Sequence, residues 1–354
     1  MKTTLKLVAA FLFRWVHFPV EPGLRIFGTP NEHSPVFLTA NFVLTLKRLS
    51  KYLQGQNCYL LVAPTNGINV WCAASGGEFT AHSVISAIKT SDINKRVKHR
   101  TLIAPQLSAP GIDPKKIQQE TGWHIKFGPV YAKDIPQYIK SGFKKSKKMQ
   151  LVEFPLQARL EMATMYFVTM VLILSLPLIV FFSELYHSLI IWAGIIVYGM
   201  YISFPYLPTR SGFVKAGFSA VIYLVAIVGL SMWTTGKPFS FTHLLIMAIL
   251  VVSVIGIDFN GTSPTYKSDL GALFYRHGHQ KFPFLTGIYS LNPYGEIQIN
   301  EEACSGCTLC YQVCPRGVYE MDLEFHKANL VHPENCINCN ACIYRCPEQC
   351  LAIV

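Results

Sequence analysis

The chain has 354 residues, of which 51% are hydrophobic and 14% charged, and its formal net charge is +11 at pH 7. This length allows two or three domains, and the long apolar runs are concentrated between residues 162 and 257. The basic residues form no stripe with interleaved aromatic residues, so we expect no nucleic-acid partner. Their densest cluster, KKSKK at 144–148, precedes the first apolar run and predicts a contact with membrane lipid on the cytoplasmic side.

Residues 1–150 are expected to form an α/β domain. Between residues 36 and 143, strand-like and helix-like segments alternate, beginning with the buried strand CYLLVAP and the helix FTAHSVISAIKT, which Thr80 can cap. RTLIAPQL and HIKFGPV are further strands, each followed by a helix. Such β-α units predict an open sheet whose ligand site lies beyond the strand ends. The N-terminal segment lacks a signal-peptide cleavage site, so we expect an amphipathic helix on the domain or membrane surface.

The first of these strands leads into NGINVWCAASGG at residues 66–77, which contains a lone thiol, Cys72. No second cysteine or nearby histidine has the spacing of a zinc or disulfide site. The residues alone leave three interpretations open: a packed core thiol, a nucleophile with a base such as His82, or an axial ligand to a metal cofactor. The last needs no partner residue, because the cofactor supplies the other ligands. The glycine pair is not a dinucleotide-binding motif.

Residues 151–260 are expected to form a transmembrane domain with four helices, followed by a linker at 261–295. Four windows of 17 to 21 residues carry no charged side chain, which is long enough to cross roughly 30 Å of hydrocarbon. The windows are Met162–Phe182, Leu185–Phe204, Ala216–Trp233 and Phe241–Ile257. Lys and Arg alternate between the connectors as the positive-inside rule requires, which predicts a multi-pass protein of the inner cell membrane with both soluble domains in the cytoplasm.

Residues 296–354 are expected to form a ferredoxin-type α+β domain that binds two [4Fe-4S] clusters. The spacing C-x2-C-x2-C-x3-C-P occurs twice, as in bacterial two-cluster ferredoxins, where the fourth cysteine of each run ligates the other cluster. The first predicted ligand set is Cys304, Cys307, Cys310 and Cys346, and the second is Cys336, Cys339, Cys342 and Cys314. Two zinc sites are the alternative. Cys350 lies outside both runs and is either a packed thiol or an exposed one that passes on a soft metal.

NVWCAA at residues 69–74 resembles the cap-helix signature of the corrinoid protein of anaerobic mercury methylation, the HgcA family. Other stretches look like the same family: VEPGL, SPVFLTANF, HRTLIAPQLSAPG, FGPVYAKDIPQYI and FNGTSPTYKS. The C-terminal cysteine region is similar to the separate two-cluster ferredoxin partner of that protein, the HgcB family. The resemblance therefore implies a natural fusion of both proteins, or a close paralogue of it.

The resemblance also implies a function, which is corrinoid-dependent methyl transfer with Cys72 as the catalytic lower axial ligand of cobalt. The implied cofactor-binding residues are Asn69, Val70, Trp71, Cys72, Ala73 and Ala74. The fused ferredoxin would return cobalt to Co(I) at a high effective concentration. The implied partners are a methyl-donor methyltransferase, a low-potential electron donor, and a methyl acceptor, either Hg(II) or another small acceptor.

Two departures from the family concern the acceptor. Ser75-Gly76-Gly77 stands where the family usually has Gly-Lys-Gly, which removes a cation near the corrin. The family's vicinal cysteine pair after the ferredoxin region has no counterpart before Val354, so a paralogue with another acceptor is an alternative to mercury. An alternative of a different class is a membrane-bound iron–sulfur electron-transfer protein whose N-terminal domain binds a partner and no corrinoid.

Overall fold

The computed structural model describes residues 2–14, 16–181, 183, 186–206, 212–235, 296–322 and 324–354. The chain divides into two compact units. Unit 1 consists of Met1–Val16 and Glu153–Pro264, and unit 2 of His17–Val152 and Thr265–Val354. The N-terminal helix therefore belongs with the apolar helices, and not with the α/β domain to which its position in the sequence assigned it.

Unit 2 contains a five-stranded sheet with the order β1-β3-β2-β4-β5. Strands β2 to β5 are parallel, and β1 pairs with β3 in the antiparallel direction. The sheet is the open α/β sheet that the repeated β-α units predict, with an antiparallel edge that they did not predict. The strands are β1 Gly23–Phe27, β2 Val36–Ala40, β3 Cys58–Ala63, β4 Thr101–Ala104 and β5 His124–Phe127.

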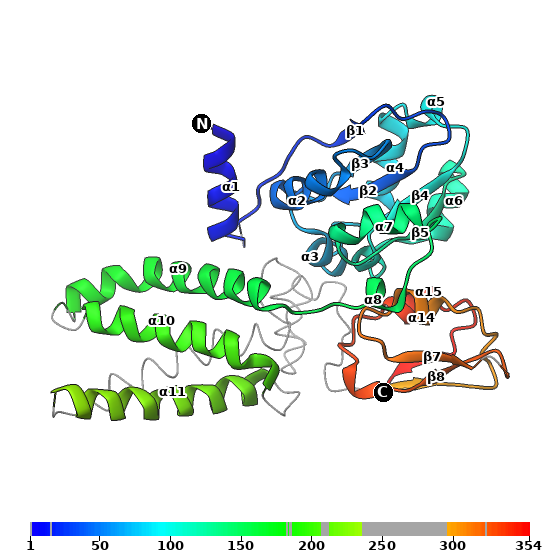
Figure 1. Ribbon diagram of the computed structural model, residues 1–354. Helices are drawn as coiled ribbons and strands as arrows, with labels where there is room; N and C mark the ends of the chain where they lie inside the picture. Colours follow the sequence, from blue (N-terminus) through cyan, green and yellow to red (C-terminus); the bar gives the residue numbers. More distant parts are fainter. Residues whose placement is uncertain are drawn as a thin grey trace, which may run out of the picture. The chain divides into compact units, whose positions relative to one another are not determined.

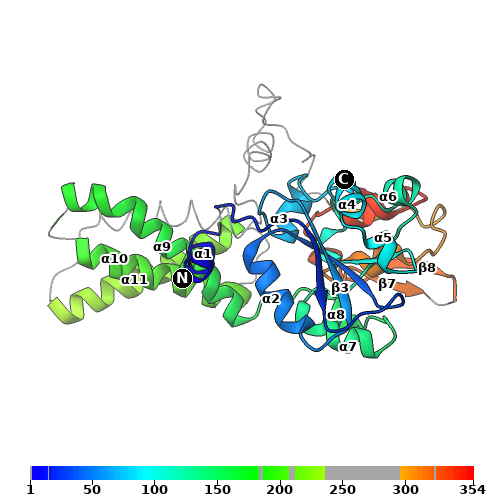
Figure 2. The same cartoon turned by 90° about the horizontal axis from the view of Figure 1, so that it is seen from above.

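Helices cover both faces of this sheet, which explains why β3 is buried along its whole length. Side chains of the odd-numbered residues of β3 join the core under α4 and α6, and those of the even-numbered residues join a second core with α2 and α7. Figure 2 shows α4, α5 and α6 on one side of the sheet and α2 and α7 on the other. These helices are α2 Val43–Leu53, α4 Ala81–Thr90, α5 Ile93–Arg96, α6 Pro114–Thr121 and α7 Ile135–Lys140.

The cap predicted for α4 is confirmed, and α6 also has a defined start and end. Thr80 and Ser83 form a capping box at the start of α4, where each side chain accepts a hydrogen bond from the other residue's backbone N–H. Asp113 caps α6 by accepting a hydrogen bond from the Lys115 N–H at 3.0 Å. Gly122 ends α6 in the left-handed conformation, with φ of +75°.

The remainder of unit 2 is a small α+β domain built from residues 296–354. Its first and last strands, β6 and β9, pair antiparallel. Strands β7 and β8 also pair antiparallel (Figure 1). Two short helices, α14 and α15, carry the middle cysteines of the two runs. The elements are β6 Ile297–Ile299, α14 Leu309–Val313, β7 Tyr319–Asp322, β8 Lys327–Leu330, α15 Ala341–Arg345 and β9 Leu351–Ile353.

The backbone of this small domain repeats itself. Left-handed residues recur at matching places in the two cysteine runs, and each second member follows the first by 32 residues. The pairs are Gly306 and Asn338, Thr308 and Asn340, and Gly317 and Gln349. Gly306 can only be glycine, because a Cβ there would collide with the carbonyl of His326. The duplicated cysteine spacing therefore corresponds to a duplicated chain path.

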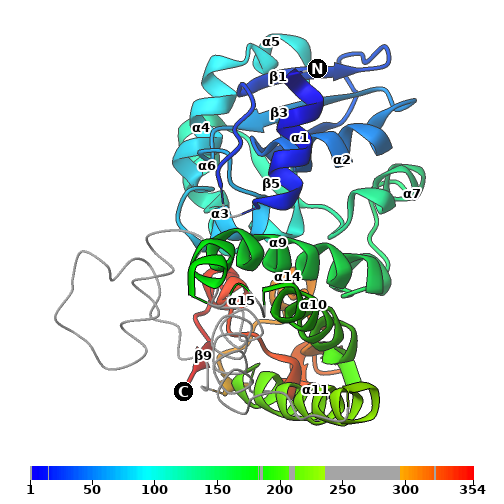
Figure 3. The same cartoon turned by 90° about the vertical axis from the view of Figure 1, so that its left-hand side faces the viewer.

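Unit 1 is helical. Helix α10 lies between α9 and α11 (Figures 1 and 3), and the three share an apolar core that includes Met170 and Val197. The N-terminal helix α1 packs on α9, where an ion pair joins Arg14 Nη2 to Glu161 Oε2 at 2.6 Å. The bounds are α1 Lys2–Leu12, α9 Leu156–Phe181, α10 Tyr186–Ser203 and α11 Gly212–Thr235.

The expectation of four membrane-spanning helices is not supported by the described residues. Helices run through three of the four windows, but the described part of the chain holds one stretch, Leu156–Ile173, that is long and apolar enough to cross a membrane. Two shorter apolar helical stretches, Ile190–Tyr206 and Gly217–Ala226, overlap α10 and α11. The fourth window, the predicted linker and the stretch FNGTSPTYKS lie outside the described residues.

Candidate functional site

The helix that carries Cys72 is α3, Val70–Ser75, which follows β3 beyond the carboxyl edge of the sheet. Asn69 caps this helix, because its Oδ1 accepts a hydrogen bond from the Cys72 N–H at 3.0 Å. The Cys72 side chain is half-buried and packs against the margin of the core under α4. The cap therefore fixes the backbone of the candidate ligand, while the residue remains partly exposed.

The two alanines of the cap helix face the core. Ala73 and Ala74 are 0% and 4% exposed. Ala74 lies against Gly111, where an added Cβ would come within 2.9 Å of the Ala74 Cα. Their small size thus allows α3 to approach the rest of the domain, which differs from the expected role of lining a macrocycle. Half-buried side chains on the same turn are those of Asn69, Val70, Trp71 and Cys72.

A buried polar network that sequence reasoning missed holds the loop before α3. Asn41, which follows β2, is 4% exposed, and its Oδ1 accepts hydrogen bonds from the N–H groups of Thr65 and Gly67, both at 2.9 Å. Gly67 has φ of +72°, and a Cβ there would collide with Pro19. The signal that could have revealed this network is the asparagine directly after the buried strand VFLTA.

These features fit an axial metal ligand. The carboxyl edge of an open α/β sheet is where such folds bind ligands, and hydrogen bonds of the loop and cap hold the backbone of Cys72 at that edge. A half-buried thiol can be reached by a cofactor, whereas the other thiol of this domain, Cys58, is fully buried in β3. His82, the base that a nucleophile would need, is an exposed residue of α4.

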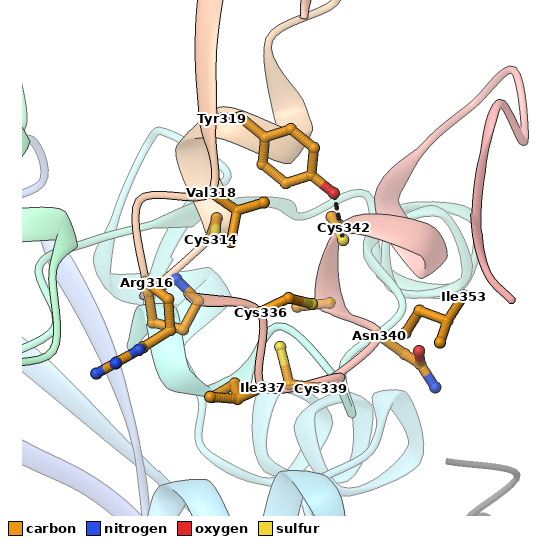
Figure 4. Close-up of a pocket in the computed structure, with 12 residues that line it drawn as sticks. Cys314, Arg316, Val318, Tyr319, Cys336, Ile337, Cys339, Asn340, Cys342 and Ile353 are labelled. Atoms are coloured by element: carbon orange, nitrogen blue, oxygen red, sulfur yellow. Dashed lines mark hydrogen bonds between the residues drawn. The ribbon is translucent and has the colours of Figure 1, made fainter. Parts of the chain in front are cut away.

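The predicted iron–sulfur ligands gather around two cavities. One cavity is lined by Cys314, Cys336, Cys339 and Cys342 (Figure 4). The other is lined by Cys304, Cys307, Cys310 and Cys346. In both cavities the fourth cysteine comes from the other run, as the ferredoxin spacing predicts.

The cysteines surround a space and do not converge on a point. Among the described residues, no three Cys, His, Asp or Glu side chains come close enough together to hold a single metal ion. Four thiolates around a cavity are the donor set of a cubane cluster. Burial raises the pKa of Cys310 and of Cys339 to about 12, so these thiols must release protons when they bind iron.

A tyrosine hydroxyl contacts one of the two cysteine sets. The Tyr319 hydroxyl donates a hydrogen bond to Cys342 Sγ at 3.1 Å (Figure 4). Burial raises the pKa of Tyr319, so this hydroxyl keeps its proton. In the other half of the repeat, 32 residues later, the corresponding residue is Leu351. Hence only one of the two cysteine sets receives this hydroxyl donor.

Within unit 2, Gln106 links the α/β domain to the cysteine-rich domain. Gln106 follows β4 and is 1% exposed. Its Nε2 donates to the carbonyls of Gln150 at 2.9 Å and Val313 at 3.3 Å, and its Oε1 accepts from Lys145 Nζ at 2.8 Å. Lys145 also donates to the carbonyl of Gln312 at 2.9 Å. Every polar atom of the buried amide thus has a partner.

Further contacts show that the junction between the α/β domain and the cysteine-rich domain lies at the carboxyl edge of the sheet. Phe127, the last residue of β5, and Ala109, after β4, pack against the core of the cysteine-rich domain. The Val152 N–H donates to the carbonyl of Pro315 at 2.8 Å, directly after Cys314. Since β3, β4 and β5 are parallel, α3 and this junction follow the same ends of the strands.

Comparisons with known proteins identify both domains of unit 2. Residues 16–139 match the family model described as CO dehydrogenase/acetyl-CoA synthase delta subunit. Residues 296–347 match the model of the 4Fe-4S dicluster domain.

Similar individual proteins match the same N-terminal part of the chain. The acetyl-CoA decarbonylase/synthase complex subunit gamma of Methanopyrus kandleri is 35% identical over 123 residues, which are 34% of this chain and 26% of that protein. The corrinoid/iron-sulfur protein large subunit of Moorella thermoacetica is 32% identical over 124 residues, which are 34% and 27%. The chain thus spans about a quarter of the length of these relatives. It combines a domain of the CO dehydrogenase/acetyl-CoA synthase delta subunit family with a 4Fe-4S dicluster domain.

Proposed function

We propose that this chain performs corrinoid-dependent methyl transfer and that its own dicluster domain supplies electrons to cobalt. The observation that carries the proposal is the position of Cys72. It lies on a capped helix at the carboxyl edge of the sheet, and the cysteine-rich domain packs on the same edge. Relatives named as corrinoid/iron-sulfur and acetyl-CoA decarbonylase/synthase subunits support the corrinoid.

The residues of α3 would hold the corrinoid. Cys72 would provide the sulfur ligand, and Asn69 would keep the first helical turn formed. Val70 and Trp71, half-buried on the same turn, would contact the ring. When bound, the corrinoid supplies a cobalt centre that accepts a methyl group and passes it to an electrophile. A thiolate is a soft, electron-rich ligand, so it favours transfer to a soft acceptor.

The dicluster domain would hold two [4Fe-4S] clusters and take electrons from a low-potential donor. Each cavity has four cysteines in its wall, which is the number that one cubane needs. Cys314 lies between Val313 and Pro315, whose carbonyls accept hydrogen bonds from the α/β domain and from the segment that follows it. The cluster of the Cys314 set is therefore our choice for the last electron donor before cobalt.

We further propose that unit 1 anchors the chain in the inner cell membrane, with the soluble domains in the cytoplasm. Large apolar side chains on α9 and α11 point outward, for example Leu176 at 73%, Val180 at 64% and Val225 at 68% exposure. Such surfaces are costly in water and are normal next to lipid. In the basic run at 144–148, Lys145 donates to Gln106 and Lys147 pairs with Glu320 at 2.6 Å. Lys144 and Lys148 are exposed, and they are the residues of this run that can contact anionic lipid.

The acceptor that we propose to test first is Hg(II). This choice comes from the resemblance to a fusion of the mercury-methylation corrinoid protein and its ferredoxin partner, and a small acceptor other than mercury is the alternative. A separate methyltransferase would provide the methyl group.

The test is anaerobic purification of the full chain from cells supplied with corrinoid, followed by metal analysis. The proposal predicts cobalt, iron and the absorption spectrum of a corrinoid, and methyl transfer to Hg(II) by the reduced, methylated protein. Iron without cobalt would support the membrane-bound electron-transfer protein instead. A loaded protein that forms no methylmercury would exclude mercury while leaving methyl transfer to another acceptor.

A further inference from the structure

A fifth thiol lies in the wall of the cavity that holds the Cys346 set. Cys350 lines this cavity together with the four predicted ligands, and its side chain is buried. Its Sγ lies 3.3 Å from Cys346 Sγ. An iron ion that Cys346 can reach is therefore within a small side-chain movement of Cys350.

The repeat within this domain shows that the fifth thiol is particular to one cavity. Cys350 follows Cys346 by four residues, and the residue four places after Cys314 is Val318. Val318 is buried in the wall of the other cavity, so the two side chains occupy matching places. A valine fills that place with an apolar group, whereas Cys350 offers a second sulfur beside the fourth ligand.

The backbone holds Cys350 in place independently of Cys346. The Cys350 carbonyl accepts a hydrogen bond from the Asn300 N–H at 2.8 Å, and the next residue, Leu351, begins the strand that pairs with β6. Removal of the Cys346 side chain would leave this pairing intact. The thiol of Cys350 would then still face the cavity.

We propose that Cys350 is a reserve ligand, which binds the iron of Cys346 when Cys346 is lost or detached. In the exchange, the Cys350 thiol gives up its proton and its thiolate forms the new Fe–S bond. The departing Cys346 thiolate takes up a proton, so the charge on the site is unchanged and no electron moves. The inference rests on the cluster assignment of the proposed function.

The test is to measure iron content and the electron paramagnetic resonance of the full chain, both oxidised and reduced, after anaerobic cluster assembly. The wild-type chain should contain about eight irons, the number in two [4Fe-4S] clusters. Cys346→Ala should keep about eight. The matched control Cys314→Ala has Val318 at the place that corresponds to Cys350 and should fall to about four, as should the double variant Cys346→Ala/Cys350→Val. Cys350→Val alone should keep both clusters.

Three results would overturn the inference. Cys346→Ala could lose as much iron as Cys314→Ala, it could show the signal of an oxidised three-iron cluster, or the double variant could keep its second cluster. If one of these results is found while the wild-type chain contains about eight irons, the assignment of two [4Fe-4S] clusters still holds and only the role of Cys350 is overturned. Fewer than two clusters in the wild-type chain would instead overturn the assignment itself, and the inference with it.

Discussion

The side-chain amide of Gln106 donates a hydrogen bond to the carbonyl of Val313, at 3.3 Å and across 207 residues of sequence. Gln106 follows a central strand of the α/β sheet, and Val313 directly precedes the cysteine that contributes to the Figure 4 cavity. The contact joins the edge of the sheet at which Cys72 lies to one of the two cysteine sets. Electron transfer from a cluster to cobalt at Cys72, as proposed above, would require such a fixed contact between the two domains.

Replacement of Gln106 by alanine should destabilise this junction. The change leaves Lys145 Nζ without one acceptor and the carbonyls of Gln150 and Val313 without a donor. Each unsatisfied buried group costs about 1–3 kcal/mol, so we expect a loss of this order in the free energy of unfolding, measured from the urea midpoint. Gln118→Ala, at an exposed position of α6, should change it by less than about 0.5 kcal/mol. Equal midpoints for the two variants would contradict a role for Gln106.

Lys145 should make this stability depend on pH. Burial, with a smaller contribution from Lys126, lowers the pKa of Lys145 from 10.5 to about 7. Between pH 7 and 10.5 the unfolded chain therefore binds more protons at this lysine than the folded chain, so stability rises with pH across this window and gains nothing below it. Urea unfolding at pH 7 and pH 9 should show a larger rise for the wild-type chain than for Lys145→Met. Lys144→Met, at an exposed position, is the control and should behave like the wild type. If stability rises equally in all three chains between pH 7 and pH 9, Lys145 is not the titrating group.

Loss of the Asn69 cap should weaken corrinoid binding without changing the ligand. Asn69→Ala removes the acceptor for the Cys72 N–H, at a cost of about 0.5–2 kcal/mol to the helix. A cost of this order lowers corrinoid affinity by about 2- to 30-fold if α3 must be formed for binding. Asn69→Asp retains a capping oxygen and should bind nearly as well as the wild type. Corrinoid titration followed by absorption measures both, and an affinity that is unchanged in Asn69→Ala would contradict the role of the cap.

Tyr319→Phe should lower the reduction potential of one cluster and leave the other unchanged. The Tyr319 hydroxyl donates to Cys342 Sγ, and hydrogen bonds to ligand sulfurs stabilise the more negative, reduced cluster. Redox titration followed by electron paramagnetic resonance measures the two potentials. Tyr344→Phe, at an exposed position of α15, is the control and should change neither. If both clusters shift together in Tyr319→Phe, the effect is not due to this hydrogen bond.

The sequence predicted those parts of the molecule that depend on local patterns. The buried strand at Cys58–Ala63 and the cap at Thr80 follow from periodicity and capping rules, and both occur in the structure. The crossed cysteine sets follow from spacing, since the x2 loops leave few ways to surround a cluster.

What the sequence did not predict depends on contacts between distant segments. The antiparallel strand β1 has no distinctive pattern, and the partners of Gln106 and Asn41 lie on other loops. The orientation of Ala73 toward the core depends on how α3 packs, which spacing does not fix. Helices of unit 1 occur in the apolar windows that the structure describes. Composition alone predicted four membrane crossings, whereas the described residues hold one helix long and apolar enough to cross a membrane.

The most direct test of the central claim is X-ray absorption at the cobalt edge of the corrinoid-loaded chain. We predict a sulfur scatterer in the first shell of cobalt in the wild-type chain and in Cys58→Ala, whose thiol lies in the core. We predict that this scatterer is absent from Cys72→Ala, with the iron content unchanged. Cobalt that has no sulfur neighbour in the wild-type chain, or that keeps one in Cys72→Ala, would contradict the assignment of Cys72 as its ligand.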